Sequence, residues 1–272
     1  MPELIIATAN VNGIRAAVRR GMEDWIAART PDVLLLQEVR APDAVVEKHL
    51  DGWHVAHEPS AIKGRAGVLV ASRLPIAAVR RGLPIPDGTE PDVDTGRWIE
   101  ADLTLPGGAG TLTVVSTYQH SGSTNPGQEA TMEAKYAYLD RVTPRLAELA
   151  AAPVPAVVAG DVNIAHTNAD IKNWRGNLKS AGFLPREREY LDRWAGLGWT
   201  DLGRAHGGDG PGPYTWWSWR GKAFDNDSGW RIDYQLANAA LAPACRKVEV
   251  ERADSYEARW SDHAAVVATY EL

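Results

Sequence analysis

The sequence is poor in cysteine and in long apolar runs. Among its 272 residues, Cys245 is the single cysteine, so no internal disulfide can form, which suits a reducing cytosol. No apolar run approaches the roughly 18 residues that a membrane span requires. Residues 1–4 lack the basic and then apolar profile of a signal peptide. We therefore expect a cytoplasmic protein with no membrane partner.

The chain also lacks an excess of positive charge, because its formal net charge is -6. A nucleic-acid-binding domain is more often basic, so this balance counts against one. Net charge is only a sum, however, and a carboxylate-rich metal site can lie beside a basic groove. Local basic clusters do occur, at residues 19–20, 80–81, 172–179, 186–188 and 220–222.

Hydrophobic periodicity predicts helices over residues 14–29, 128–151 and 185–197, with Pro144 kinking or dividing the second. Short apolar or alternating runs predict strands throughout the chain. They cover residues 4–9, 33–36, 53–57, 67–72, 76–80, 98–103, 112–118, 154–159, 216–219, 232–237, 248–251 and 264–270. The two halves carry similar elements without a linker between them. We therefore expect one α/β domain over residues 1–272, with two sheets packed face to face and helices outside.

Polar side chains follow strand after strand. Asp161 and Asn163 come directly after Gly160, and in an extended chain two such residues point to the same side. Gly, Asp and Asn alone more often mark a turn. The polar ending recurs at other strand ends, however, so the sequence predicts one shared pocket. The residues at those other ends are Asn10, Asn12, Glu38, Tyr118, Asp233, Asp262 and His263.

These segments resemble the motif set of the exonuclease III family of AP endonucleases, within the endonuclease/exonuclease/phosphatase superfamily. The resemblance extends from the first strand to the last, through residues 10–16, 36–38, 160–164, 230–234 and 261–263. Gly-Asp-x-Asn and Ser-Asp-His are common to the superfamily. Residues 172–174, 183–189 and 229–233 are more specific and resemble the bacterial DNA-repair branch. The resemblance implies a four-layered α/β sandwich of two mixed, mainly antiparallel sheets.

The resemblance also implies catalytic roles for five residues. Asp161 would orient or deprotonate the attacking water, and Asn163 would help to place it and the phosphate. His263 would contact a non-bridging phosphate oxygen. Asp233 would hold the tautomer of His263 and favour its charged form. Tyr118 would lie near the leaving oxygen or the phosphate.

A divalent metal ion, Mg²⁺ or Mn²⁺, is the expected cofactor. Glu38 is the best candidate ligand, because Mg²⁺ prefers hard oxygen donors and needs only one or two carboxylates. Asn12 is a second candidate, although it stands where some family members have Asp and an amide is a weaker ligand. Asp262 is a third candidate and would bind the metal through a water molecule. The alternative for Asp262 is that it caps the end of a strand.

Basic and aromatic residues are expected to contact DNA, because lysines and arginines that meet phosphates supply most of the non-specific affinity. Trp216 and Trp230 would form the wall of a pocket for a base-free deoxyribose rotated out of the duplex. Trp217 has two alternatives: it could form part of the same wall, or it could pack in the core. The candidate substrate-binding residues are Asn10, Lys172, Trp174, Arg175, Lys179, Trp216 and Trp230.

Two features depart from the family pattern. Gln119-His120-Ser121-Gly122 follows Tyr118, where relatives carry Pro-Asn-type residues, so a phosphate contact made there in relatives is replaced or lost. Trp216 stands where relatives often have Phe, and the larger ring is expected to narrow the pocket or alter which damaged ends are accepted.

The resemblance implies a DNA-repair phosphodiesterase that acts on double-stranded DNA. It would cut 5′ of abasic sites and also trim or unblock 3′ ends, and it implies no obligate protein partner. Two alternatives remain open. The first is a superfamily phosphoesterase that acts on an inositol phosphate or a phospholipid, and the second is a catalytically silent DNA-binding protein.

Overall fold

The computed structural model describes residues 3–84 and 95–272. Strands of this part of the chain form two six-stranded sheets, in the orders β11-β12-β1-β2-β4-β3 and β5-β6-β7-β8-β10-β9. The first sheet contains β1 (Glu3–Asn10), β2 (Val33–Gln37), β3 (His54–Glu58), β4 (Val68–Ser72), β11 (Cys245–Glu251) and β12 (Ala265–Glu271). The second contains β5 (Ile76–Arg81), β6 (Trp98–Thr104), β7 (Thr111–Tyr118), β8 (Ala156–Asp161), β9 (Thr200–Asp201) and β10 (Asp233–Ala237).

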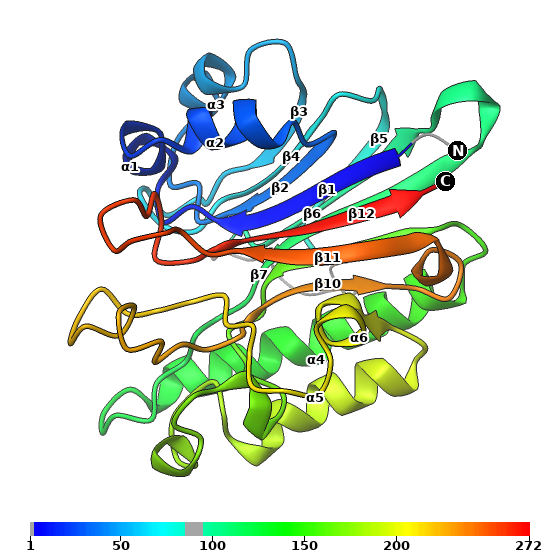
Figure 1. Ribbon diagram of the computed structural model, residues 1–272. Helices are drawn as coiled ribbons and strands as arrows, with labels where there is room; N and C mark the ends of the chain where they lie inside the picture. Colours follow the sequence, from blue (N-terminus) through cyan, green and yellow to red (C-terminus); the bar gives the residue numbers. More distant parts are fainter. Residues whose placement is uncertain (1–2, 85–94) are drawn as a thin grey trace.

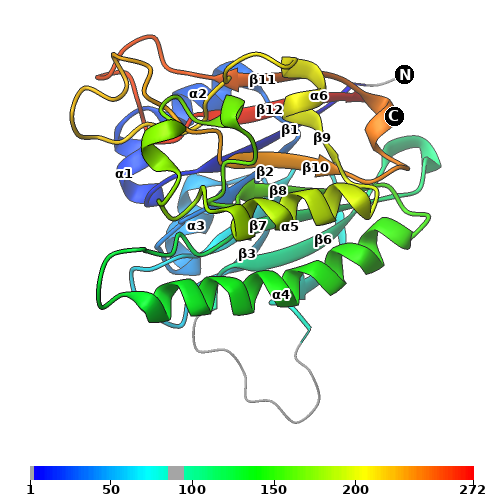
Figure 2. The same ribbon diagram turned by 90° about the horizontal axis from the view of Figure 1, so that it is seen from below.

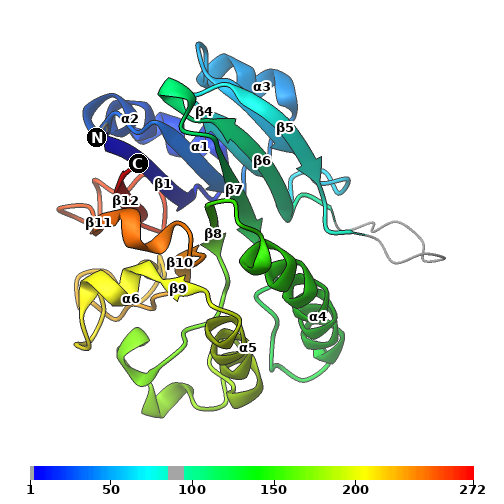
Figure 3. The ribbon, with the colours of Figure 1, turned by 90° about the vertical axis from the view of Figure 1, so that its right-hand side faces the viewer.

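Helices cover the outer faces of both sheets (Figures 1 and 3). The first sheet is covered by α1 (Ile14–Arg19), α2 (Met22–Arg29) and α3 (Asp43–His49), and the second by α4 (Glu129–Ala151) and α5 (Pro185–Gly196). The short helix α6 (Leu202–Gly207) packs against β10 and β11. The predicted four-layered α/β sandwich is confirmed. Among the described helices, none has the length and apolar character needed to cross a bilayer.

Alternating side chains divide the core into layers. Along β2, Val33 and Leu35 pack between the two sheets, whereas Leu34 and Leu36 pack against the helices outside the first sheet. Successive strand residues point to opposite faces, so a strand covered on both sides must be apolar throughout. The strand β8 follows the same rule, with its residues buried throughout. Both strands therefore end abruptly where polar residues begin.

The two sheets repeat one pattern of strand pairing. Each has a parallel pair at its centre, β1–β2 and β7–β8, and its other pairs are antiparallel. Each set of six consecutive strands also places its last two in the opposite sheet: β5–β6 complete the second sheet and β11–β12 the first. The expected similarity of the two halves is thus present, and the halves interlock. Parallel strands bring their carboxyl ends to one edge, which is where the polar residues lie.

Three local expectations are wrong. The helix predicted over residues 14–29 is two helices, because Gly21 adopts a left-handed φ of 103° between them. Pro144 does not divide α4, whose buried face, including Leu139 and Leu146, packs against the second sheet on both sides of it. Residues 216–219 form no strand, because their backbone N–H groups turn to two different neighbours, Trp230 and Asp262.

Candidate active site

Polar strand ends from both sheets meet at one place. Tyr118 lies opposite Asp161 across β7–β8, and Asp161 lies opposite Asp233 across β8–β10. From the first sheet, Asn10 ends β1 and Glu38 follows β2. The Asn10 Nδ2 donates to Glu38 Oε1 at 2.8 Å and to Asp161 Oδ2 at 2.9 Å, so one buried amide joins the two sheets. The structure therefore brings these predicted strand-end residues together.

Gly160 permits the close approach of the two parallel strands that carry Tyr118 and Asp161. Its φ is 143°, and a Cβ at this position would lie 2.0 Å from the carbonyl oxygen of Thr117. No side chain fits there, so any residue other than glycine would force β7 and β8 apart. Gly160 thus fixes the position of Asp161 within the sheet.

The Asp161 carboxylate is held by its neighbours. Asn163 donates its backbone N–H to Asp161 Oδ1 at 2.9 Å and its Nδ2 to Asp161 Oδ2 at 3.2 Å. The same Nδ2 donates to the carbonyl of Gln119 at 2.9 Å. Asn163 has a left-handed φ of 55°, which is uncommon outside glycine but tolerated by Asn. This turn places both side chains of the predicted pair at the pocket.

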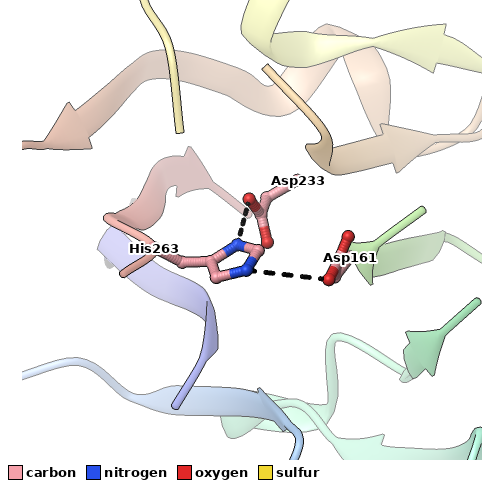
Figure 4. A group of neighbouring side chains, drawn as sticks. All are labelled: Asp161, Asp233 and His263. Atoms are coloured by element: carbon pink, nitrogen blue, oxygen red, sulfur yellow. Dashed lines mark hydrogen bonds and ion pairs between the residues drawn. The ribbon is translucent and has the colours of Figure 1, made fainter. Parts of the chain in front are cut away.

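A histidine–aspartate pair, His263 and Asp233, lies beside this carboxylate. Figure 4 shows the imidazole of His263 between two aspartates. His263 Nδ1 lies 2.8 Å from Asp233 Oδ2, and His263 Nε2 lies 3.8 Å from Asp161 Oδ2. The Thr215 hydroxyl donates to the same Asp233 oxygen at 2.6 Å, which fixes the carboxylate from behind. The geometry leaves Nε2 as the ring nitrogen that faces the pocket.

Electrostatics set the protonation of these groups. Burial alone would lower the pKa of His263, but Asp233 outweighs it and raises the pKa to about 10, so the imidazolium persists at neutral pH. Burial raises the pKa of Asp161 to about 7 despite the opposing charge of His263. Burial, Glu38 and Asp161 raise the pKa of Tyr118 well above its ordinary value, so the phenol keeps its proton.

The site offers oxygen donors suited to a divalent cation. Glu38 Oε2 accepts a hydrogen bond from the guanidinium of Arg40, so this carboxylate already attracts positive charge. Asn12 Nδ2 donates to Asp262 Oδ1 at 2.9 Å. Trp216 Nε1 donates to the other Asp262 oxygen at 3.2 Å. These acids, together with the family described below, imply a divalent metal ion.

The cluster of Asp161, Asp233 and His263 is less suited to hold that ion. The ligand atoms of Asp161, Asp233 and His263 lie within 4.8 Å of one another. The imidazole nitrogen Nδ1 already shares its proton with Asp233, and an imidazole that bonds in this way orients a base or an acid. We therefore treat the hydrogen-bonded pair of His263 and Asp233, with Asp161 beside it, as a unit separate from Glu38.

Apart from the buried Asn10, the predicted DNA-contacting residues fall into two groups. Lys172, Arg175 and Lys179 are exposed, and the Arg175 guanidinium stacks 4.2 Å from the ring centre of Trp174. Figure 2 shows their segment, which precedes α5, on the outside of the molecule. This exposed segment remains a candidate DNA contact.

The aromatic group lies nearer the pocket. Trp216 meets Trp230 edge to face, with ring centres 6.3 Å apart, and lies 6.4 Å from the ring of His263. Trp217 is buried, packs against Phe224 and donates to Asp227, so of the two alternatives left open for it the structure favours core packing.

Sequence reasoning missed several residues that support the site. The Ser261 hydroxyl donates to the Asn10 carbonyl at 2.6 Å, and its place in the Ser-Asp-His motif was the only signal. Thr215, Arg40 and the buried Lys135 gave none, since each acts through a contact distant in sequence or beyond the motif. The departing segment after Tyr118 is structural in part, because Gln119 donates its N–H to the Asp161 carbonyl.

Comparisons with known proteins agree with this geometry. Residues 7–263 match the family described as "Endonuclease/Exonuclease/phosphatase family". The chain is 30% identical to exodeoxyribonuclease III of Haemophilus influenzae, over 96% of this chain and 97% of that protein.

Solved structures are similar over the same length. An AP endonuclease from Archaeoglobus fulgidus is 29% identical with a TM-score of 0.84, and the match covers 99% of this chain and 100% of that one. The 3′ phosphatase NExo from Neisseria, bound to a product DNA hairpin, is 28% identical with a TM-score of 0.79 and the same coverage. The chain therefore belongs to the endonuclease/exonuclease/phosphatase family, and it resembles the family's exonuclease III and AP endonuclease members from end to end.

Proposed function

We propose that this protein is a divalent-metal-dependent DNA-repair nuclease that hydrolyses the phosphodiester 5′ of abasic sites and leaves a 3′-hydroxyl. We further propose that it trims duplex DNA from 3′ ends and removes blocked 3′ groups. The observation that carries the proposal is the meeting of Asp161, the His263–Asp233 pair and Glu38 at the ends of strands from both sheets.

Hydrolysis needs a nucleophile, neutralisation of developing charge and help for the leaving alkoxide. Asp161 accepts the proton of the attacking water, and Asn163 orients that water and the phosphate. The imidazolium of His263 donates from Nε2 to a non-bridging phosphate oxygen, while Asp233 holds the ring. Tyr118 remains a phenol and donates to the leaving oxygen or the phosphate. Asn10 keeps the carboxylates of the two sheets in fixed relation.

Glu38 would hold the metal ion, with Asp262 and Asn12 as further oxygen donors. The observation that supports this assignment is the guanidinium of Arg40 on the Glu38 carboxylate, where a cation is already favoured. A bound Mg²⁺ or Mn²⁺ neutralises charge on the phosphate as it develops. We propose Mg²⁺ as the physiological ion because the donors are hard oxygens.

Two adjoining grooves give the DNA backbone a cationic path to the site. One, of about 570 Å³, is lined by Glu38, Tyr118, Arg97 and other residues that lead to α4. The other, of about 530 Å³, has charged lining residues Arg15, Arg40, Lys63 and Arg65 among the described part of the chain. Cationic side chains along both grooves favour binding of a polyanion such as DNA, although the net charge of the whole chain is -6.

The substrate class also follows from the aromatic wall. Trp216 and Trp230 meet at a right angle beside His263, which suits a flat sugar without its base. The exodeoxyribonuclease, AP endonuclease and DNA-bound 3′ phosphatase relatives support a DNA substrate over an inositol phosphate or a phospholipid. We also propose a cytoplasmic location for this protein.

One assay tests the proposal. A 5′-labelled duplex with a single abasic analogue is incubated with the protein and Mg²⁺, with and without EDTA. We expect one cut 5′ of the abasic position, a 3′-hydroxyl product and no product in EDTA. Cleavage of an inositol phosphate or phospholipid with an intact abasic duplex would refute the proposal.

The variant Asp161→Asn distinguishes an enzyme from a silent DNA-binding protein. We expect its kcat to fall by about 10²–10⁴, the usual contribution of a general base, while its affinity for the abasic duplex stays within about twofold of wild type. Fluorescence anisotropy in EDTA measures that affinity. Wild-type binding without any turnover would favour the silent protein instead.

A further inference from the structure

A fully buried ion pair joins α4 to α5 near the candidate site. Lys135 and Glu187 are both 0% exposed, and Lys135 Nζ lies 2.5 Å from Glu187 Oε1. Charged side chains are almost never fully buried without a partner. The pair lies outside the residues assigned to the chemistry, so its presence in the interior needs a separate explanation.

Lys135 reaches two segments that border the pocket. Its Nζ donates to the carbonyl of Asn163 at 3.0 Å and to the carbonyl of Ser121 at 3.1 Å. Asn163 is the residue with left-handed backbone whose N–H and side chain hold Asp161. The ammonium therefore also fixes the backbone of this turn, through the Asn163 carbonyl.

Glu187 holds a third segment. Its carboxylate accepts from the backbone N–H of Gly182 at 2.7 Å and of Leu184 at 2.9 Å. Gly182 packs closely enough that a Cβ there would lie 3.0 Å from the Asn163 carbonyl oxygen and 3.2 Å from the Trp230 ring. The segment that leads from the exposed Lys172 group to α5 is thus anchored against both the catalytic turn and the aromatic wall.

Stability alone does not explain such a pair, because apolar residues of similar volume are often neutral or stabilising replacements for a buried ion pair. Apolar side chains cannot, however, donate to two carbonyls or accept from two N–H groups. We propose that Lys135 and Glu187 form a positioning pair that fixes Asn163, the segment after Tyr118 and the Gly182 turn relative to Asp161. The inference rests on the proposed function, in which Asp161 and Asn163 place the attacking water.

Steady-state kinetics of Lys135→Met on the abasic duplex tests the inference. A displacement of about 1 Å in a reacting group can cost on the order of 10²-fold in rate, so we expect kcat to fall by about tenfold to a hundredfold. The KM and the Kd measured in EDTA should stay within about twofold, because the substitution leaves the arginine and lysine side chains that line the two grooves in place. All assays are run well below the melting temperature of each variant.

The matched control is Arg145→Met on the same helix. Arg145 pairs with Glu100 of β6 at 2.7 Å through two nitrogens, whereas Lys135 contacts Ser121 and Asn163. We expect this variant to lose thermal stability while its kcat stays within about twofold of wild type. An equal loss of kcat in both variants would show that α4 merely stabilises the fold, which overturns the inference.

Glu187→Gln keeps the shape and the acceptor oxygen for the two backbone N–H groups but removes the charge, so it remains informative if Lys135→Met fails to fold. We expect kcat to fall with KM retained, and the double variant to lose no more than the worse single variant, as in a coupled pair. A folded Glu187→Gln variant with wild-type kcat overturns the inference. An inactive wild type instead refutes the proposed function, so the two failures are distinguishable.

Discussion

At the scale of single residues, the site depends on how Asp233 is held. Its Oδ2 accepts from Thr215 and faces His263 Nδ1, while Oδ1 has no hydrogen-bond partner among the residues that the structure describes. A carboxylate so constrained can only orient one ring and favour its charge. We therefore propose that Asp233 positions His263, and its loss should alter the pH at which the imidazolium disappears.

We expect Asp233→Asn to shift the alkaline limit of activity toward neutral pH. Burial lowers the pKa of His263 and Asp233 raises it to about 10, so removal of the carboxylate should bring the pKa toward or below its ordinary value of 6.5. The imidazolium exists below the pKa. Wild type therefore keeps it until the pH rises through about 10, whereas the variant loses it near neutrality. A profile of kcat against pH measures the shift.

His49→Gln is the control, because His49 pairs with Glu23 on the outer surface and should leave the profile unchanged. If Asp233→Asn reduced kcat equally at every pH, the charge of His263 would not be what Asp233 supplies.

The sequence predicted those residues that act within motifs. Asp161, Asn163, Asp233 and His263 could be identified because each lies at a recognisable strand end. Thr215, Arg40 and Lys135 could not, because an isolated threonine, arginine or lysine carries no pattern until the fold shows what it touches. For Trp217 the sequence left two alternatives open, because only the fold shows that Trp216 lies beside His263 whereas the ring of Trp217 packs against Phe224.

At the scale of elements, a buried ionic network fastens the segment after β8. Asp170 is fully buried, and its Oδ1 accepts a hydrogen bond from Arg231 Nε at 2.6 Å. Arg231 Nη2 also donates to Asp201 Oδ2 at 2.7 Å. Burial opposes ionisation of Asp170, but Arg231 and Arg204 outweigh it and lower the pKa to about 2. The lowered pKa means that this stabilisation is present above the ordinary carboxyl range and is lost only as the pH falls through about 2.

We expect Arg231→Met to lower the free energy of unfolding by about 3–5 kcal/mol, because it leaves Asp170 as a buried charge with one partner fewer. Urea unfolding measures the change. Arg246→Met is the matched control: Arg246 pairs with Glu271 at the surface, so its loss should cost less than about 1 kcal/mol. Equal effects of the two substitutions would contradict the role of the network.

Long, periodic elements were predictable and short ones were not. The helix α5 and most strands were found because several apolar residues recur at one period. The helices α3 and α6 and the two-residue strand β9 were missed, since too few residues contribute to any period. Gly21 shows another limit: a single glycine within a helical pattern can be tolerated, and only the backbone angle reveals a break.

At the scale of the whole molecule, the interlocked halves bear on cooperativity. The β5–β6 hairpin belongs to the sheet built mainly from the second half, and β11–β12 to the sheet built mainly from the first. Residues of both sheets, such as Leu35 and Val157, share one core. Neither half can complete a sheet alone, and we therefore propose one domain over residues 1–272.

A single cooperative unfolding transition is the expected result. Tryptophan fluorescence and far-ultraviolet circular dichroism, followed through the same urea titration, should give coincident curves. Two separated transitions, or an N-terminal half that folds in isolation, would show that the halves are independent domains.

The repeated parallel pairs also account for a division of labour between the two acids. In the second sheet Asp161 is the last residue of its strand, opposite Tyr118, but in the first sheet that position is taken by Gln37, opposite Asn10. The acid there is Glu38, one residue beyond the end of β2, where a left-handed φ of 49° departs from the strand. The same construction, offset by one step, thus brings two carboxylates to the Asn10 amide, one paired with Arg40 and the other beside His263.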